Sequence, residues 1–298
     1  MQRGMPDSSR STDLSRMADS GIERLPEGCI AQAISLTSPR DACHSSAVSS
    51  AFRSAAASDT VWERFLPSDC HSILSRAVHP VEYSSKRDLF FLLCDSVLID
   101  GGKMSFWLER SSGVKCYMLS ASALSIIWGD TPQYWKWVSL PDSRFSEVAQ
   151  LVAVCWLEIR GRIQSKMLSP RTTYAAYLIF KLADSSRGLG HPPHETSVTV
   201  GAQSSTRAIR LQPRGTDRHA LMMVNFRGGA PEVEEEELGG RVREDGWMEA
   251  EMGEFYNEDG EDEEDEEVVM SWMEVKGGHW KKGLIVEGIE IRPKTLAI

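Results

Sequence analysis

Residues 25–66, LPEGCIAQAISLTSPRDACHSSAVSSAFRSAAASDTVWERFL, contain the signals that decide how the chain begins to fold. Leu25-Pro26 predicts the start of one helix, because proline at the first helical position fixes φ and gives up only an N–H that would lack a partner anyway. Ser38 followed by Pro39 predicts a second start, with the serine as the N-cap. The two signals predict short helices separated by a tight turn.

A third helical run follows and ends before Pro67, with an apolar face that includes Trp62 and Phe65. About forty residues bury little core on their own, so a unit of this size usually completes its burial against something else. The stretch therefore predicts a three-helix docking module. A helical cap on the following domain is the alternative that the residues leave open.

The order of these signals resembles the F-box motif: Leu25-Pro26, the SPRD turn at 38–41, Val48-Ser49, and the distal Trp62. The resemblance assigns residues 21–67 to an F-box and implies docking on an Skp-type adaptor and, through it, on the core of a cullin ubiquitin ligase. The residues that it implies for docking are Leu25, Pro26, Ile30, Pro39, Val48, Phe52 and Trp62.

The composition is that of an ordinary soluble protein, with 298 residues, 41% hydrophobic and 26% charged. Residues 1–20 are polar and rich in serine, so we expect a disordered tail and no signal peptide. The most apolar run, residues 89–99, is too short to span a bilayer and carries Asp95. We expect a chain of the cytoplasm and nucleus with no membrane partner.

The net charge of −10 is unevenly distributed. Residues 232–267 hold nineteen acidic and two basic residues, a net charge of −17, so the rest of the chain carries +7. Blocks of this kind are usually solvated, which predicts acidic loops at 232–246 and 257–267. Calcium binding is a weaker alternative, since the regular alternation of oxygen ligands is missing. The chain shows no Lys/Arg stripe, so no nucleic-acid partner is expected.

Six cysteines lie far apart without a CxxC pair, which predicts reduced thiols. The pairs Cys43-His44 and Cys70-His71 are adjacent in sequence, and neighbouring residues seldom ligate one ion together. We expect no metal and no cofactor.

From Met104 onward the hydrophobic period changes from 3.6 to 2, after a connector at 67–85 and a helix at 86–98. Residues 156–163 alternate Leu157, Ile159 and Ile163 against polar residues and Trp156. Short strands with turn signals between them predict a β-sandwich, and residues 191–231 are expected to be loops with one weak strand near 197–201. The predicted strands are 156–163, 172–182, 247–255, 268–275 and 284–291.

Residues 125–137, SIIWGDTPQYWKW, place three tryptophans and a tyrosine beside turn residues. Exposed aromatic faces of this kind suit a sugar, whose C–H groups stack on an indole while its hydroxyls form hydrogen bonds. Burial of the tryptophans in the core is the equally weighted alternative.

Several motifs in order resemble the phloem-protein-two, or Nictaba-related, lectin domain: LSIIW (124–128), TPQYW (131–135), VCWLE (154–158), LSPRTTY (168–174), DGWME (245–249), GEFY (253–256) and GLIVEGIEIRP (283–293). The resemblance implies an α+β chain: the three-helix F-box, a helical linker at 68–103 and a jelly-roll-like sandwich at 104–294. It also implies a carbohydrate site at Trp128, Trp135, Glu267 and Glu274 for glycans that contain N-acetylglucosamine.

Together the two resemblances imply a substrate-recognition subunit of an SCF-type ubiquitin ligase that binds glycans or glycoproteins and performs no chemistry itself. An adaptor that reads a protein surface without sugar is the second hypothesis. A hydrolase that pairs Glu158, Glu249 and Glu251 across a groove is the third, and no nucleophile elbow, phosphate loop or HExxH motif supports it.

Overall fold

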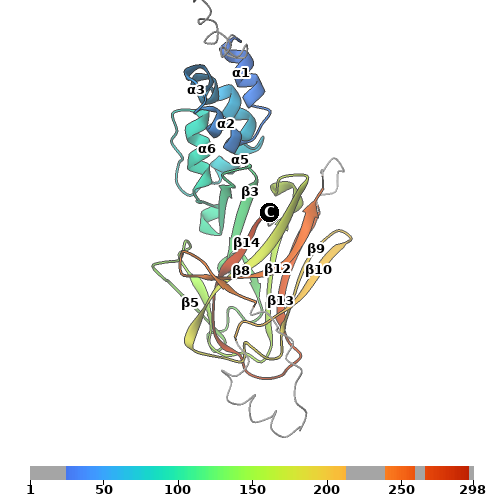
Figure 1. Cartoon of the computed structure of the whole chain (residues 1–298). Helices are drawn as coiled ribbons and strands as arrows, with labels where there is room; N and C mark the ends of the chain where they lie inside the picture. Colours follow the sequence, from blue (N-terminus) through green and yellow to red (C-terminus); the bar gives the residue numbers. More distant parts are fainter. Residues whose placement is uncertain (1–24, 213–238, 259–265, 295–298) are drawn as a thin grey trace, which may run out of the picture.

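A computed structural model describes residues 25–212, 239–258 and 266–294 of the chain. The predicted tail at 1–20 and residues 232–238 and 259–265 of the predicted acidic loops lie outside these residues. The described chain has helices at one end and β-sheets at the other (Figure 1). The predicted α+β fold is confirmed.

The helical end contains more helices than the sequence predicts. Ser58 has an extended backbone (φ −61°, ψ 137°) and divides the expected third helix into two. Pro26 is the N-cap of the first helix and not its first residue, whereas Ser38 caps the second helix as predicted by accepting a hydrogen bond from the Asp41 N–H. The helices are α1 Glu27–Ile34, α2 Pro39–Ser45, α3 Ser50–Ala57, α4 Asp59–Phe65, α5 Cys70–Ser75 and α6 Lys86–Cys94.

The predicted connector and linker at 67–103 are part of the packed structure. They contain α5, α6 and a first strand, β1 (Val97–Ile99), which pairs with β2 and ends the expected helix early. The side chain of Arg76 makes two hydrogen bonds to Asp100, of 2.8 and 2.5 Å, which fix α5 to the start of the sheet. The β-domain therefore begins before Met104.

The helices and sheets share one hydrophobic core. Phe90 on α6 packs between Trp62 and Phe65 on the helical side and the β2–β3 turn on the other. Gly113 in that turn has a φ of +76°, and a Cβ there would lie 3.1 Å from the Phe65 carbonyl oxygen. The turn can approach the helices this closely only because it carries a glycine.

Two antiparallel sheets form the other end. The larger has the order β1-β2-β3-β14-β8-β12-β11, with β5 and β6 beside β14, and the smaller has the order β10-β9-β13-β7-β4. The strands are β1 Val97–Ile99, β2 Met104–Leu108, β3 Lys115–Ser120, β4 Ser125–Ile126, β5 Trp135–Val138, β6 Val148–Leu151, β7 Leu157–Gln164, β8 Thr172–Arg187, β9 His194–Val200, β10 Gln203–Ile209, β11 Arg241–Val242, β12 Met248–Asn257, β13 Glu267–Glu274 and β14 Lys282–Pro293. Short 3-10 helices lie at Asp100–Gly102, Ala121–Ala123 and Ser165–Met167.

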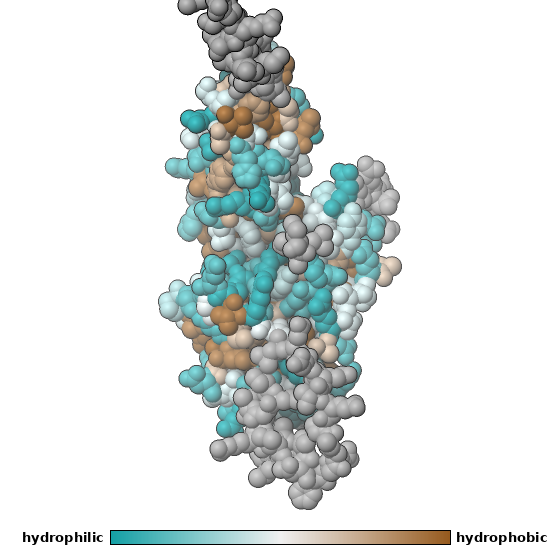
Figure 2. Space-filling view, in the orientation of Figure 1, coloured by the Kyte–Doolittle hydropathy of each residue, from teal (hydrophilic) through white to brown (hydrophobic). Residues whose placement is uncertain are grey.

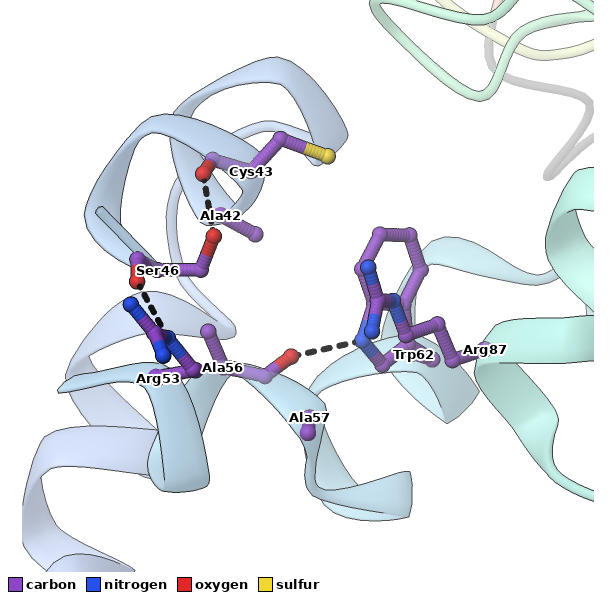
Figure 3. Close-up of a pocket in the computed structure, with 8 residues that line it drawn as sticks. All are labelled: Ala42, Cys43, Ser46, Arg53, Ala56, Ala57, Trp62 and Arg87. Atoms are coloured by element: carbon purple, nitrogen blue, oxygen red, sulfur yellow. Dashed lines mark hydrogen bonds between the residues drawn. The ribbon is translucent and has the colours of Figure 1, made fainter. Parts of the chain in front are cut away.

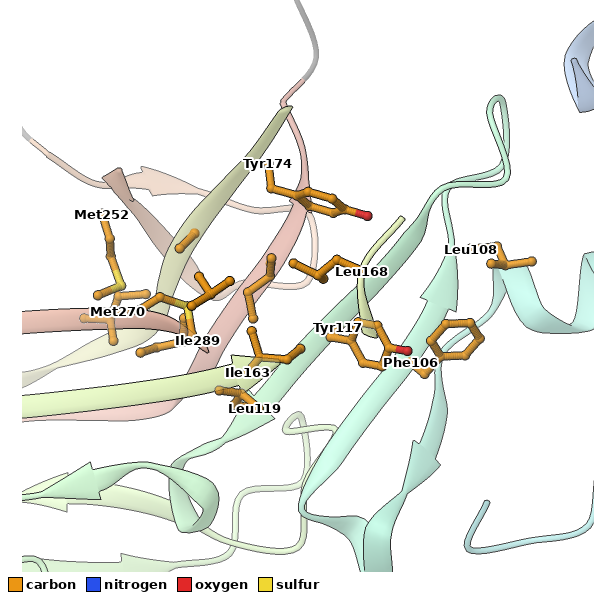
Figure 4. Packing of buried hydrophobic residues seen from close by; sticks show 14 of the residues in the cluster. Phe106, Leu108, Tyr117, Leu119, Ile163, Leu168, Tyr174, Met252, Met270 and Ile289 are labelled. Carbon is orange, nitrogen blue, oxygen red and sulfur yellow. The ribbon is translucent and has the colours of Figure 1, made fainter. Parts of the chain in front are cut away.

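The two sheets pack face to face as a sandwich. Ile163 and Met270 from the smaller sheet meet Met252, Leu119 and Ile289 from the larger one (Figure 4). These five side chains are at most 4% exposed. The alternation predicted for 156–163 is confirmed, because Leu157, Ile159 and Ile163 of β7 all face this core.

Residues 191–231 were expected to be loops, but 194–209 form the β9–β10 hairpin. Every second side chain of β9 is buried, as in a half-buried strand. Two of these buried residues, His194 and Thr196, are polar, so the sequence does not show the alternation of apolar and polar residues that predicts a strand. The predicted loop boundaries also shift, since β11 lies inside 232–246 and β13 already includes Glu267.

Candidate functional site

The helical end carries exposed aliphatic side chains at its outer tip. Leu25 is 47% exposed and Val48 66%, whereas the exposed Leu36 follows the other end of α1 and lies near Ser112 and Pro170 of the β-domain. Pro26 is exposed beside Leu25. Apolar colour gathers at this tip, far from the sheets (Figure 2). Exposed aliphatic groups concentrated at one end of a molecule are typical of a protein-binding surface.

Other predicted docking residues lie inside the helical unit. Ile30 is 2% exposed and Trp62 only 1%, and Pro39 is also buried. Trp62 donates a 2.7 Å hydrogen bond from Nε1 to the Ala56 carbonyl and packs against aromatic rings of α4 and α6. Phe52 is half-buried against the core. The predicted set thus divides into an exposed part that can contact a partner and a buried part that holds the helices together.

A pocket of about 160 Å³ opens between α2, α3, α4 and α6 (Figure 3). Its walls are mainly alanines and the indole of Trp62, and the guanidinium of Arg87 lies over that ring at 5.8 Å. Arg53, also at the pocket, donates from Nε to the Ser46 carbonyl at 3.5 Å. The pocket thus combines small apolar side chains with two arginines.

The β-domain exposes three indoles close to where β4, β5 and β7 begin or end. Trp128 is 41% exposed, Trp137 37% and Trp156 45%. A fourth tryptophan, Trp280, is 60% exposed beside the bridge between Lys281 and Val154. Trp137 donates from Nε1 to the Gly129 carbonyl at 2.9 Å, which ties its ring to the loop that carries Trp128. Tyr134 packs against Trp128 with ring centroids 5.1 Å apart.

Trp128 itself has a φ of +57°, a left-handed conformation that is strained for a bulky residue. Strain of this kind persists only where the surroundings enforce it, and it is concentrated at ligand sites. The hydrogen bond from the Ile127 N–H to the Glu158 carbonyl holds this loop against β7, beside Trp156. The exposed indoles therefore occupy one end of the smaller sheet.

The structure does not gather the four predicted carbohydrate residues into one site. Trp128 is exposed, but Trp135 is 2% exposed. Glu267 and Glu274 are the first and last residues of β13, and seven steps along an extended strand separate them by roughly 23 Å. Glu267 is paired with Arg162 at 2.8 Å.

Glu274 forms part of a buried polar cluster. Its carboxylate pairs with the fully buried Lys281 and accepts a 2.8 Å hydrogen bond from the Gly277 N–H. Burial raises the pKa of this carboxyl, but the hydrogen bonds from Lys281 and Gly277 outweigh it and leave the pKa below its ordinary value. Glu274 in this arrangement stabilises the fold and does not face solvent.

The carboxylates of the hydrolase hypothesis do not form a pair. Glu158 lies on β7 of the smaller sheet, whereas Glu249 and Glu251 lie on β12 of the larger one. Glu249 is 4% exposed and is bound by Arg241, Arg243 and Arg292, with which it forms an ion-pair cluster. This geometry gives no groove with two free carboxylates.

The described residues contain neither a candidate metal site nor a candidate membrane-spanning helix. No cluster of three or more His, Cys, Asp or Glu side chains there could hold an ion. No helix within residues 25–212, 239–258 and 266–294 is long and apolar enough to cross a bilayer.

Comparison with known proteins places the chain. The family model described as phloem protein 2 matches residues 114–293. The chain belongs to the phloem protein 2 family. The match begins at the β2–β3 turn and ends with β14, so it covers the sandwich with its exposed indoles.

Relatives within this family extend over the helices as well. The F-box protein At2g02240 of Arabidopsis thaliana is 47% identical over 92% of this chain and 81% of its own length. The F-box proteins PP2-B10 and PP2-B1 of the same plant are 45% and 42% identical, and cover 93% and 96% of the chain and 96% and 94% of their own lengths. Both resemblances predicted from the sequence, to plant F-box proteins and to the phloem-protein-two domain, are confirmed.

The predicted carbohydrate set left out Trp156, and also Trp137 although it belongs to the aromatic stretch at 125–137. A signal for Trp156 was present, because the alternation of 156–163 places it on the polar side with Glu158 and Arg160. A tryptophan on the polar side of a half-buried strand is exposed, and exposed indoles are typical of binding surfaces.

Proposed function

We propose that this phloem protein 2 family member is the substrate-recognition subunit of an SCF-type ubiquitin ligase. Its relatives are F-box proteins by name, and the exposed aliphatic tip of the helical end supports the same role for this chain. Leu25 and Val48 contact an Skp-type adaptor, and the buried Ile30 and Trp62 keep these side chains in place. The cullin core is reached through the adaptor. The chain brings a target close to the ligase and catalyses no reaction itself.

The continuous core between helices and sheets supports this function. A receptor raises the effective concentration of its target near the ligase, and a stiff connection limits the positions that the target can take. Lys115 on β3 pairs with Asp69 at the start of α5 at 3.1 Å, in addition to the pair between Arg76 and Asp100. The β-domain is thus held at a defined orientation to the adaptor.

We propose further that the β-domain captures its target through a glycan. The exposed indoles of the β-domain support this proposal, since an indole face covers the apolar side of a sugar ring. Trp128 keeps the role predicted for it, while Trp137 and Trp156 take the place of the buried Trp135. Glycans that contain N-acetylglucosamine are the first ligands to test, on glycoproteins of the cytoplasm and nucleus. Capture of a protein surface without sugar is the alternative.

Adaptor capture tests the ligase part of the proposal. Val48→Glu places a charge on the aliphatic tip, so we expect capture of a purified Skp-type adaptor to fall by at least about tenfold. Val78→Glu is the matched control, because Val78 is 40% exposed on the same helical unit but lies next to β1. Adaptor capture by Val48→Glu at the wild-type level would refute docking at this tip.

Glycan arrays test the second part. Trp128→Ala removes an exposed ring and should abolish binding to N-acetylglucosamine oligomers without changing the thermal unfolding temperature by more than a few degrees. If the variant keeps its fold and its sugar binding, the indole cluster is not the site. Wild-type protein that captures the adaptor and ignores every glycan would favour recognition of a protein surface.

A further inference from the structure

The outer face of the smaller sheet carries polar groups that its fold does not use. On β13, Met270 and Trp272 are both fully buried in the core between the sheets. Side chains alternate along a strand, so Ser271 between them points to the opposite, outer face. The outer face of β7 is likewise marked by its half-buried and exposed residues, among them Glu158, Arg160 and Arg162.

The strand register aligns polar side chains across all five strands of this sheet, four with hydroxyl groups and one with a guanidinium. Residues directly opposite each other on antiparallel strands share a face. Ser271 pairs with Arg160 on one side and with Ser197 on the other, Arg160 pairs with Ser125, and Ser197 pairs with Thr206. We call these residues, in spatial order, the hydroxyl row: Thr206, Ser197, Ser271, Arg160 and Ser125.

The centre of the hydroxyl row has unused hydrogen-bonding capacity. Ser271 is 7% exposed, and its Oγ has no partner among the described residues. Nε of the neighbouring Arg160 also lacks a partner there, although the other end of that guanidinium binds Glu158 at 2.7 Å. Buried polar atoms are nearly always satisfied, so two adjacent unsatisfied ones indicate a group that binds from outside.

The chemistry of the row favours a neutral, hydroxyl-rich ligand. A serine or threonine hydroxyl both donates and accepts, which matches another hydroxyl better than it matches an anion. The arginines on this face are already neutralised, Arg160 by Glu158 and Arg162 by Glu267. Neighbouring positions in the row lie about 5 Å apart, and the whole row spans roughly 19 Å. That spacing is close to the repeat of an extended β-linked sugar chain.

The row is also connected to an exposed indole. Trp156 is on the outer side of the alternation and donates from Nε1 to Glu158 at 2.9 Å, and Glu158 in turn binds Arg160. We propose that the hydroxyl row is a binding site for a neutral oligosaccharide that lies across the strands, with Trp156 to one side of the row, four residues from Arg160 along the chain. This inference rests on the glycan part of the proposed function and adds that successive sugar units are read along the row.

A length series tests the proposal with the full chain. Binding is measured on an array of N-acetylglucosamine, mannose and galactose oligomers from monomer to tetramer. We expect wild-type affinity to rise with length for at least one series. Ser271→Ala and Arg160→Met should each weaken tetramer binding by about fivefold to tenfold and leave monomer binding unchanged. A general folding defect would weaken both equally.

Thr199→Val is the matched control, because Thr199 is on the same face of β9 but belongs to the next row, opposite Val269. It should bind every oligomer as the wild type does. Tetramer binding by Ser271→Ala at the wild-type level would overturn the proposal, as would a wild-type affinity that does not change with length. Displacement of the tetramer by inorganic sulfate would also overturn it, in favour of an anion site. Adaptor capture, measured on the same variants, reports separately on the ligase function.

Discussion

The two ends of the molecule expose different kinds of apolar surface. The helical end presents the aliphatic Leu25 and Val48 at its tip and buries its tryptophan, whereas the end of the smaller sheet presents indoles such as Trp128 and Trp156. Aliphatic side chains pack against other proteins, while flat amphipathic rings suit ligands that combine apolar faces with hydroxyls. Tryptophans occur at both ends. A buried tryptophan stabilises the helical unit, whereas an exposed one in the β-domain is available to a ligand.

Trp62→Ala should give the largest effect, because it empties a fully buried site among Phe65, Phe90 and Phe91. We expect the free energy of unfolding to fall by about 3–5 kcal/mol. Trp156→Ala, at an exposed indole, should lower it by less than about 1 kcal/mol. Urea unfolding followed by circular dichroism measures both. Equal losses would mean that the two ends do not differ in the way described.

Acid should weaken the sandwich through His194. Burial lowers the pKa of this imidazole to about 3. The nearby Lys281 and His279 also lower the pKa, whereas Glu274 raises it. In the unfolded chain the group takes up a proton near its ordinary value, so the unfolded state binds more protons than the folded state between the two pKa values. Stability therefore falls as the pH is lowered through this window, by about 2 kcal/mol between pH 7 and 5.

His194→Gln should remove most of this pH dependence, since the glutamine amide stays neutral and its oxygen can still accept the hydrogen bond from Trp272. His71→Gln is the control at the helical end, because His71 is exposed. Denaturant unfolding at pH 7 and pH 5 provides the measurement. A wild-type slope that persists in the His194 variant would assign the acid sensitivity to another group.

Gly113→Ala tests the joint between the two regions. Alanine is strained at a φ of +76°, and its Cβ would press on the Phe65 carbonyl oxygen. We expect a loss of about 1–3 kcal/mol. Gly246→Ala is matched in φ, at +80°, but meets no atom within 4 Å, so it should lose less. Thermal unfolding compares the two variants, and the difference between them measures the packing of the turn on the helices. Equal changes in the unfolding temperature of the two variants would show that the β2–β3 turn does not pack tightly on the helices.

Ser38→Ala should have the smallest effect of the four, a loss of about 1 kcal/mol from removing an N-cap. The hydroxyl accepts from the Asp41 N–H at 3.1 Å and donates to the Asp41 carboxylate at 2.7 Å. Ser75→Ala, whose hydroxyl only bonds back to the Ser72 carbonyl, should stay within about 0.5 kcal/mol of the wild type. An unchanged unfolding midpoint in Ser38→Ala would show that α2 is held by packing alone.

Local signals predicted the elements that depend on local chemistry. The Ser38 cap and the alternation of β7 are correct because each involves residues that are close in sequence. The break at Ser58 and the β9–β10 hairpin were not predicted. Ser58 is no stronger a helix breaker than its neighbours. The buried side of β9 includes His194, a polar residue that burial keeps neutral, so the sequence pattern did not indicate a buried position there.

The arrangement of the candidate carbohydrate site depends even more on contacts between residues that are distant in sequence. The sequence could place Trp128 and Trp135 in one aromatic stretch, but only packing buries one and exposes the other. Glu267 and Glu274 are close in sequence, yet an extended strand carries them to opposite ends of a sheet.

The sequence by itself determined the two families of motifs, the α+β class and five of the longer strands, since these follow from residue type and period. Tertiary structure alone decided which indoles face solvent and that the helices and sheets share a core. It also aligned Ser271 with hydroxyls on neighbouring strands, because strand register and side-chain burial are fixed by contacts between residues far apart in the chain.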